Sequence, residues 1–407
     1  MKPVVFHVDV NSAYLAWSAL HGLSRGAEVD LRTIPSIVGG DPENRHGIVL
    51  AKSGPAKEYG IVTAETLFSA LAKCPSLVIV PPNFKIYSKA SEALTELLSR
   101  HTPILERYSI DECFLEMGEI SREEALALAH RIRNEVRTEL GFTVNVGVGL
   151  NKLSAKMASD FKKPDMVHTL YPDEVCDKLH PLPVEELFMV GPALAEKLRN
   201  INIRTIGDLA RCDREYLAQQ FGKMGRLIWN FAWGKDSSRV NPEGTVEIKG
   251  MGNSTTLPRD LTQRADCHRT ILSLLETTVG RLKEAGFHTT CIAVHYTTMD
   301  FKTRRRQKQL ANQTDSIQFI YEVSCQLFDE IWLGQPVRKI GVSFTRLRTN
   351  QVVQLSMMDL AEVQKEERLN DAVSKIRHRF GDSSLVRASF VDSEIRPFSG
   401  GIDDQDF

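Results

Sequence analysis

Two adjacent carboxylates interrupt a strand-like run in the middle of this 407-residue chain. The run is Tyr108-Ser109-Ile110-Asp111-Glu112-Cys113-Phe114-Leu115. Neighbouring residues of a strand point to opposite faces, so Asp111 and Glu112 can converge on one ion only at a bend or at a strand end. We therefore expect a turn between two strands at this point of the chain.

A third carboxylate ends the first apolar run, Val4-Val5-Phe6-His7-Val8-Asp9, which is typical of a strand. If this strand lies beside the one that carries Asp111 and Glu112, three carboxylates meet at one end of a sheet. Oxygen ligands without His or Cys suit a hard cation such as Mg²⁺. Two such ions would activate a 3′-hydroxyl and neutralise a leaving pyrophosphate. A solvated acidic turn is the alternative at this stage.

Composition limits the class of protein. A chain of 407 residues with 42% hydrophobic and 25% charged residues predicts roughly three to four globular domains. The N-terminal region lacks a basic segment followed by a long apolar one, so we expect neither secretion nor a membrane span. Seven cysteines without a C-x-x-C pair argue against zinc and disulfides and favour a reducing, cytoplasmic setting.

Local patterns predict a ferredoxin-like sheet with helices on one face. A capping box of Ser121 and Glu124 begins a helix that Gly141 ends. The expected elements are a strand at 4–9, a helix at 11–20 capped by Asn11 or Ser12, a helix at 86–97, the strand pair around 109–115, a helix at 121–141 and a strand at 143–148.

Basic side chains recur at positions where an anion could bind. The run Lys52-Ser53-Gly54-Pro55-Ala56-Lys57 offers backbone N–H groups and positive charge, although it lacks the P-loop spacing. Lys152 and Lys156 lie one turn apart on a predicted helix, where they repel each other unless an anionic partner is present. A solvated lysine turn is the alternative for the first of these segments.

The second half of the chain changes character. Residues 190–198 and 206–209 predict two helices around a glycine hairpin, which either binds a phosphate or is a plain helical hairpin. After a polar linker at 236–246, residues 244–350 hold 15 Lys and Arg against 10 Asp and Glu. That excess indicates a DNA-binding module or a merely solvated basic face. The apolar strip at 351–360 predicts a docking peptide or an edge strand.

Taken together, these segments resemble the Y-family translesion DNA polymerases, most of all the branch of the bacterial DNA polymerases IV. The resemblance covers nearly the whole chain, and Ser109-Ile110-Asp111-Glu112 with Asp9 is its most specific part. It implies an α+β multidomain right-hand polymerase with a ferredoxin-like palm, small fingers, a helical thumb with a helix-hairpin-helix, and an α/β little finger. The implied bounds are palm 1–12 and 82–170, fingers 13–81, thumb 171–241, linker 242–246, little finger 247–350 and a tail 351–407 with a clamp-binding peptide.

The resemblance also implies site residues. Asp9, Asp111 and Glu112 would be catalytic and would bind two Mg²⁺ ions together with the backbone carbonyl of Val10. The implied nucleotide-binding residues are Tyr14, as a steric gate against the 2′-hydroxyl of ribonucleotides, Lys57, Tyr87 and Lys163. The implied DNA-binding residues are Lys152, Gly191, Arg338 and Lys339, and the implied clamp-binding residues are Gln354, Leu355, Met357 and Met358.

The chain departs from the family pattern at several of these places. Asn11 replaces a frequent Asp, Ala13 an aromatic residue and Gly54 a tyrosine. Lys57 replaces an arginine, which exchanges a bidentate fork for a point charge. We therefore expect weaker nucleotide binding with intact chemistry. Met357-Met358 in place of Leu-Phe affects clamp affinity, and Met189 takes the place of a glycine in the thumb hairpin.

The function expected from this resemblance is low-fidelity, DNA-templated DNA synthesis past damaged bases. The expected partners are primer-template DNA, deoxynucleoside triphosphates and the β sliding clamp, and the protein is expected to be a monomer. One alternative is a catalytically weak or inactive, clamp-tethered DNA-binding accessory protein of the same fold. Another is a nucleotide cyclase, which shares a palm-like sheet and a metal pair but needs neither a thumb hairpin nor a basic module.

Overall fold

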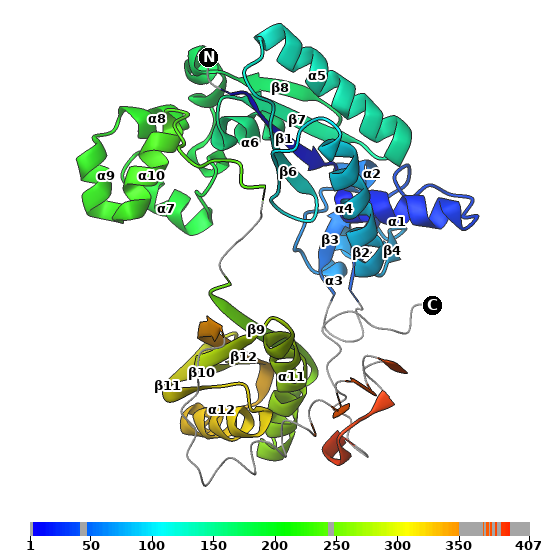
Figure 1. Ribbon diagram of the computed structural model, residues 1–407, viewed down its shortest axis with the longest axis vertical. Coiled ribbons are helices and arrows are strands. Elements are labelled where there is room, and N and C mark those ends of the chain that lie inside the picture. Colours follow the sequence, from blue (N-terminus) through cyan, green and yellow to red (C-terminus); the bar gives the residue numbers. More distant parts are fainter. Residues whose placement is uncertain are drawn as a thin grey trace. The chain divides into compact units, whose positions relative to one another are not determined.

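The computed structural model describes residues 3–40, 47–242 and 248–349, together with short stretches between 369 and 390. These residues form two compact units, one of residues 3–40 and 48–242, the other of residues 248–349 and the described residues beyond. Each unit has its own sheet and its own core (Figure 1).

The first unit is built on a five-stranded sheet of order β5-β6-β1-β7-β8. Strand β1 is antiparallel to both β6 and β7, and its register places Asp9 directly opposite Glu112. The predicted strands around the acidic residues are therefore neighbours. The strands are β1 (Val5–Val10), β5 (Leu105–Arg107), β6 (Glu112–Glu116), β7 (Val144–Gly149) and β8 (Val167–Leu170).

Residues of β1 alternate between two faces of this sheet. Phe6, Val8 and Val10 are buried in the core that helices α4 (Phe84–Ser99) and α5 (Arg122–Glu135) cover. His7 and Asp9 point to the opposite face, where helix α6 (Lys152–Asp160) lies. The two helices of the predicted ferredoxin-like unit thus lie on one face as expected, and α6, which follows that unit, covers the other face.

Two glycines of β7 allow α6 to approach the sheet closely. A Cβ atom on Gly147 would overlap the backbone oxygen of Ala155 and the amide nitrogen of Ser159, and one on Gly149 would overlap the side chain of Ser154. Asn145, on the same face of β7, donates from its side chain to the carbonyl oxygens of Ser159 and Lys162 at 2.9 and 2.7 Å. The end of α6 is thus fixed against the backbone of the sheet.

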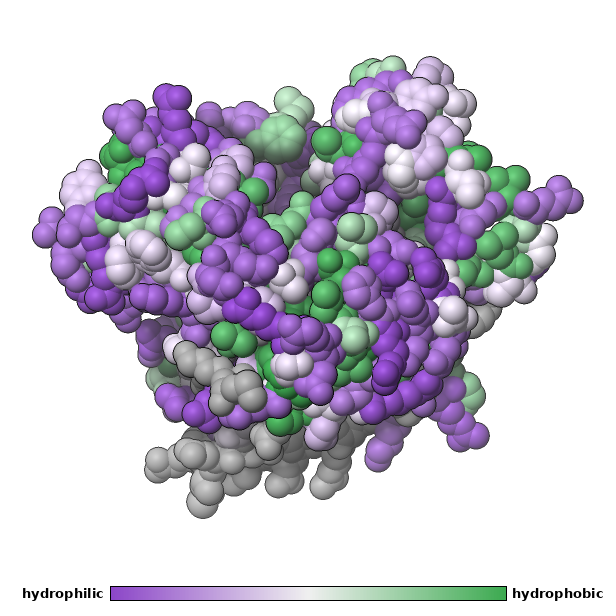
Figure 2. Space-filling model, turned by 90° about the horizontal axis from the view of Figure 1, so that it is seen from above, coloured by the Kyte–Doolittle hydropathy of each residue, from purple (hydrophilic) through white to green (hydrophobic). Residues whose placement is uncertain are grey.

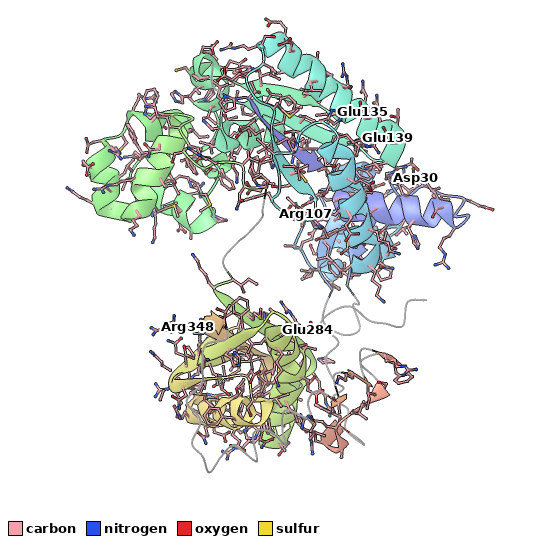
Figure 3. The ribbon with its side chains drawn as sticks, viewed as in Figure 1. Asp30, Arg107, Glu135, Glu139, Glu284 and Arg348 are labelled. Carbon is pink, nitrogen blue, oxygen red and sulfur yellow. The ribbon has the colours of Figure 1, made fainter. Side chains whose placement is uncertain are left out.

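Of the two predicted helix N-caps, one forms with its side-chain bonds and the other lacks them. Ser121 and Glu124 form the expected capping box at the start of α5, which continues as a π-helical turn (Val136–Leu140) to Gly141. Glu135 and Glu139, on this last part of the helix, bond His101 and Arg100 at the end of α4, both at 2.7 Å (Figure 3). Ser12 occupies the N-cap of α1 (Ala13–Ser24) in a left-handed conformation without a side-chain bond.

Residues 33–81 form a small sheet and two short helices of their own. They form a sheet of order β3-β2-β4 in which β2 and β4 are parallel. Its elements are β2 (Ser36–Gly39), β3 (Val49–Lys52), α2 (Gly54–Glu58), α3 (Leu67–Lys73) and β4 (Val78–Val80). Four of these segments, all except α3, hold only three to five residues and are too short to show a clear local periodicity.

The remainder of the first unit is helical, around a core of its own. The two expected helices flank the hairpin at residues 201–205. The elements are the short turns Pro172–Glu174, Val175–Leu179 and Val184–Glu186, then α7 (Pro192–Asn200), α8 (Ile206–Arg211), α9 (Arg214–Phe221) and α10 (Lys223–Ala232).

The second unit has a four-stranded antiparallel sheet of order β11-β10-β12-β9. Two long helices, α11 and α12, bury one face of it, with Ile292, Val294 and Phe344 among the core residues. Figure 3 labels Glu284 at the end of α11 and Arg348 on β12. The elements are β9 (Gly250–Leu261), α11 (Arg264–Glu284), β10 (Phe287–Thr298), β11 (Thr303–Thr314), α12 (Ile317–Ile331) and β12 (Val337–Thr349), followed by the turn Ala388–Phe390.

The surface is that of an ordinary globular protein. Figure 2 shows a face on which hydrophilic residues predominate and hydrophobic residues appear between them. Within the described ranges, no helical segment combines the length and the apolar character that a bilayer crossing needs.

The close approach at Gly147 gives a first prediction. Gly147→Ala should lower the free energy of unfolding by at least about 2 kcal/mol, because the new methyl group displaces the backbone of α6. Urea unfolding followed by circular dichroism measures this loss. Gly54→Ala is the control, since a Cβ there meets nothing within 4 Å and should cost no stability. Equal stability of the two variants would contradict the packing described here.

Candidate active site

Three carboxylates gather where β1, β6 and the turn before β6 meet. Asp9 and Glu112 face each other across the two strands, and cross-strand partners share a face of the sheet. Asp111 lies in the turn between β5 and β6, and Figure 3 labels Arg107 at the end of β5. The N–H of Val10 donates to the carbonyl oxygen of Asp111 at 3.0 Å, which fastens the turn to the end of β1.

Each of these carboxylates bonds its protein partners through a single oxygen. Lys163 contacts Oδ2 of Asp9 at 2.6 Å, and the hydroxyl of Ser109 donates to Oδ1 of Asp111 at 2.6 Å. His7 and Lys156 both contact Oε2 of Glu112, at 3.2 and 2.8 Å. Among the described residues, no side chain or backbone group bonds the second oxygen of any of the three carboxylates.

Burial and neighbouring charges act in opposite directions on these groups. Burial would raise the pKa of Glu112, but hydrogen bonds from His7 and Lys156 lower it to about 2. Burial raises the pKa of Asp9 despite the attraction of Lys163. Burial opposes the charge of Lys163, yet Asp9 and Asp160 together raise the pKa of that ammonium group.

The donor set fits a hard divalent cation. It consists of carboxylate oxygens at one strand end, each with an oxygen left over for a ligand, and Val10 ends β1 beside them. Carboxylate and carbonyl oxygens are the ligands that Mg²⁺ prefers. In the described part of the chain, no three His, Cys, Asp or Glu side chains are already arranged around one ion position. The lysines bonded to Asp9 and Glu112 supply the positive charge that a cation would bring.

An aromatic stack adjoins the acidic residues. Tyr14, on the first turn of α1, stacks on Tyr87 with ring centroids 4.6 Å apart and meets the edge of Phe84 at 5.9 Å. Tyr87 is fully buried and its hydroxyl bonds Ser18 at 2.8 Å. Tyr87 therefore supports the ring of Tyr14 from behind, while Tyr14 is the half-exposed member of the pair. The Asp111 carboxylate lies close enough to reinforce the effect of burial, and both raise the pKa of Tyr14.

The predicted nucleotide cations lie on different elements. Lys57 is exposed on α2, which Ser53 caps by accepting from the N–H of Ala56. Gly54 lines a cavity of about 160 Å³ together with Asn11 and Arg32. The amide group of Asn11 is buried there without a hydrogen-bond partner among the described residues.

Lys152 and Lys156 each form an ion pair with an acidic side chain of the protein. Lys152 bonds both carboxylate oxygens of Glu106, at 2.6 and 2.7 Å, and Lys156 bonds Glu112. The anionic partner inferred from their spacing is therefore supplied by the protein itself. This pairing could not be predicted from local sequence, because Glu106 lies 46 residues from Lys152. A contact of Lys152 with DNA stays a prediction.

The helical hairpin presents an open groove. Gly191 is the N-cap of α7 and is exposed, and Met189 before it has a φ of 73°, a conformation that favours glycine. Met189 and Gly191 line a groove of about 650 Å³ with Phe221 and Met224. The departure from glycine at Met189 therefore coincides with a strained backbone position.

The second unit carries a basic open sheet face. Ile340 and Val342 of β12 point into the helix-covered core, so Lys339, Gly341 and Ser343 point to the open face. The register sets His295 beside Gly341 and Arg305 beside His295. Arg338 lies over the ring of Phe301 at 4.9 Å. The four strands hold nine Lys and Arg residues but one acid, Asp260: Arg259, Arg304, Arg305, Arg306, Lys308, Arg338, Lys339, Arg346 and Arg348.

Two groups of residues remain to be placed: the predicted clamp-binding residues, and two residues beside Glu112 that were not predicted. The predicted clamp-binding residues Gln354, Leu355, Met357 and Met358 lie outside the described residues. Sequence reasoning did not single out His7 or Ser159, which bond each other at 2.8 Å beside Glu112. The signal for His7 was present, because it precedes Asp9 by two residues on the same predicted strand and hence shares its face.

Comparison with known families finds three matching segments. Residues 8–160 match the impB/mucB/samB family, and residues 248–357 match the C-terminal domain of that family. Residues 185–236 match the thumb domain of DNA polymerase-iota.

Whole proteins and a solved structure also match. A DNA polymerase IV of Clostridium acetobutylicum is 43% identical over 395 residues, which cover 97% of this chain and 100% of that protein. A DNA polymerase IV of Acetivibrio thermocellus is 37% identical over 393 residues, covering 95% and 97%. The structure of a Y-family DNA polymerase chimera, Dbh-Dpo4(243-245)-Dbh, has a TM-score of 0.74 at 24% identity and covers 85% of this chain and 100% of that one. This likeness concerns the fold.

The partners of Glu112 predict a pH dependence of stability. The pKa of about 2 in the folded protein lies below the ordinary value of 4.5. The stabilisation by Glu112 is therefore complete above about pH 4.5 and is lost as the pH falls toward 2. Urea unfolding of wild type and Glu112→Gln in metal-free buffer, from pH 6 to pH 3, should show a stability difference that shrinks below pH 4.5. A difference independent of pH would contradict the ion pair.

Proposed function

Because this chain belongs to the Y-family DNA polymerases, in the DNA polymerase IV group, we propose that it extends primers past damaged template bases by two-metal nucleotidyl transfer. It is a DNA-directed DNA polymerase, as the full-length match at 43% identity indicates. The observation that carries the proposed mechanism is the gathering of three carboxylates at one strand end, each with one oxygen left for a cation.

In this proposal Asp9, Asp111, Glu112 and the carbonyl of Val10 hold two Mg²⁺ ions. When bound, the ions activate the primer 3′-hydroxyl and neutralise the charge of the departing pyrophosphate. Lys163 and Lys156 offset part of the repulsion between the carboxylates in the absence of the ions. The protein thus holds the acidic groups close together, which is preorganisation of the kind that electrostatic catalysis requires.

Nucleotide binding is assigned to residues around this centre. Lys163 is held between Asp9 and Asp160 at 2.6 and 2.8 Å, so a cation stands beside the carboxylates where a triphosphate would need one. Lys57 adds an exposed positive charge on α2. The ring of Tyr14, fixed from behind by Tyr87, would meet the 2′ position of the incoming sugar and exclude a hydroxyl there.

Tolerance of damaged templates is supported by small side chains. Ala13 and Gly54 stand where the family pattern has larger residues, and Gly54 lines a cavity. Fewer contacts to the incoming nucleotide leave fewer means of rejecting an irregular base pair. The same lack of contacts should weaken nucleotide binding.

We assign DNA binding to the basic sheet face of the second unit. Lys339 and Arg305 lie on this open face, where they would contact phosphates of the DNA backbone. Arg338 and the exposed Gly191 of the helical hairpin are assigned to further phosphate contacts. We further propose that Gln354-Leu355-Ser356-Met357-Met358 binds the β sliding clamp and that the enzyme works as a cytoplasmic monomer.

The two alternatives have less in their favour. An inactive accessory protein would not require three carboxylates at one strand end. A nucleotide cyclase does not bind DNA and would not require a basic open sheet face. No observation on this chain favours either of them over the polymerase.

The carboxylates are tested by substitution. Asp111→Ala and Glu112→Ala should each abolish Mg²⁺-dependent extension of a primer on template DNA, because each removes a metal ligand, while primer-template binding stays nearly intact. Gel-based extension and fluorescence anisotropy measure the two properties. Glu116→Ala, at the far end of the same strand, is the matched control and should extend primers normally. Extension at the normal rate by either site variant would remove the metal assignment.

The steric gate is tested separately. Tyr14→Ala should raise incorporation of ribonucleotides by at least about tenfold relative to deoxynucleotides, since the ring that meets the 2′-hydroxyl is gone. Single-nucleotide insertion kinetics with the two substrates give this ratio. Phe84→Ala also shortens the aromatic cluster but leaves the stacked pair intact, so its ratio should stay near that of the wild type.

A further inference from the structure

A buried histidine bonds one of the proposed metal ligands from inside the protein. Nε2 of His7 contacts Oε2 of Glu112 at 3.2 Å, and Nδ1 contacts the hydroxyl of Ser159 at 2.8 Å. The side chain of His7 has no exposed surface, so it touches neither nucleotide nor DNA. Building on the proposed function, we propose that His7 is a positioning residue that holds Oε2 of Glu112 and leaves Oε1 directed toward a divalent cation.

The location of His7 follows from the fold. It precedes Asp9 by two residues on β1 and so shares its face, and the register sets it opposite Phe114, whose ring centroid lies 4.5 Å away. The close packing of α6 over Gly147 brings Ser159 to the other side of the imidazole. The ring is therefore fixed from two sides before it reaches Glu112.

Counting hydrogens shows how the ring is oriented. The hydroxyl of Ser159 has a single hydrogen and two acceptors in reach, the carbonyl oxygen of Lys156 at 2.8 Å and Nδ1 of His7. A neutral imidazole carries one N–H. Nε2 donates to Glu112 in the neutral ring when Ser159 turns its hydrogen to Nδ1, and in the protonated ring when Ser159 donates to the carbonyl of Lys156 and accepts from Nδ1.

Lys156 cannot replace this function. It contacts the same Oε2 atom of Glu112, but through a long flexible chain that also lies over the rings of Tyr108 and Phe188, at 5.9 and 5.7 Å. His7 reaches Glu112 through a rigid ring without rotatable bonds beyond Cγ. Lys156 thus compensates the charge of the Glu112 carboxylate, and His7 fixes its orientation. Orientation of a metal ligand in this way typically changes metal affinity by about 10- to 100-fold.

The buried polar chain is hard to explain by stability alone. His7, Ser159 and Asn145 are all fully buried and bonded in sequence around the end of α6, next to the apolar residues Val5 and Ala155. Asn145 bonds backbone groups of Ser159, Lys162 and Met166, but apolar side chains of similar volume at His7 and Ser159 would fill the site without buried polar atoms that need partners. The polar chain ends on a proposed metal ligand, which a purely structural role does not require.

The test compares four full-length variants. His7→Leu removes the donor at similar volume, His7→Gln restores an N–H near the position of Nε2, and Ser159→Ala removes the group that orients the ring. Val8→Ala is the matched control, because Val8 neighbours His7 on β1 but faces the opposite core, so it loses stability without touching Glu112. Thermal unfolding measures stability. Calorimetric titration with Mn²⁺ of each protein bound to primer-template DNA, and the Mg²⁺ dependence of extension, measure ion binding.

We expect His7→Leu to weaken Mn²⁺ binding and to raise the half-maximal Mg²⁺ concentration by about tenfold or more. His7→Gln should recover most of this loss, and Ser159→Ala should show a smaller loss in the same direction. Val8→Ala should be less stable with an unchanged Mg²⁺ requirement. Should His7→Leu not fold, Ser159→Ala carries the test, since it keeps the ring.

Two results would overturn the role of His7: a Mg²⁺ requirement of His7→Leu equal to that of Val8→Ala, or no recovery in His7→Gln. Either leaves the polymerase proposal standing, provided that wild type extends primers and binds Mn²⁺. If wild type itself neither binds Mn²⁺ nor extends a primer on a template, the proposed function fails instead.

Discussion

The candidate site depends on one constraint, the alternation of side chains along β1 in register with β6. Phe6 and Val8 are buried in the core beneath α4 and α5, so hydrophobic burial fixes which residues face inward. His7 and Asp9 are thereby fixed on the other face, with Asp9 opposite Glu112. A slip of β1 by one residue would turn Asp9 away from Glu112 and bury its charge in the core. The free energy of core packing is thus what holds the carboxylates together.

A second element, α6, completes the site because β7 offers almost no side chain beneath it. Gly147 and Gly149 let the helix backbone approach the strand, and Asn145 fastens its C-terminal end. The helix brings Lys156 to Glu112, and the loop after it brings Lys163 to Asp9. Like charges at one strand end would otherwise repel strongly in a partly buried site. The lysines offset this repulsion, and cations bound by the remaining carboxylate oxygens would add to the same balance.

Much of this arrangement could be predicted from local signals. The strand ending at Asp9, the acidic turn, and the capping box at Ser121 each depend on a few neighbouring residues, and the structure contains all of them. The domain bounds and the roles of individual residues stay predictions. His7 was within reach of the same reasoning, because the period of two along a strand already placed it beside Asp9.

The features that were missed depend on contacts between distant segments. The position of α6 on the second face follows from glycines on another element, and the ion pair of Lys152 with Glu106 joins residues 46 positions apart. Tyr87 was expected to bind nucleotide, yet its burial behind Tyr14 follows from the packing of α4 on α1. No periodicity in a single sequence contains this information.

The central claim is that Asp9, Asp111 and Glu112 hold divalent cations through the oxygens that their protein partners leave over. The most direct test is a crystal structure of the protein with primer-template DNA, a non-hydrolysable deoxynucleotide and Mn²⁺, recorded at the manganese absorption edge. The account predicts anomalous peaks within coordination distance of all three carboxylates, with His7 still bonded to Oε2 of Glu112. Peaks bound elsewhere, or a nucleotide seated without any ion at these residues, would contradict it.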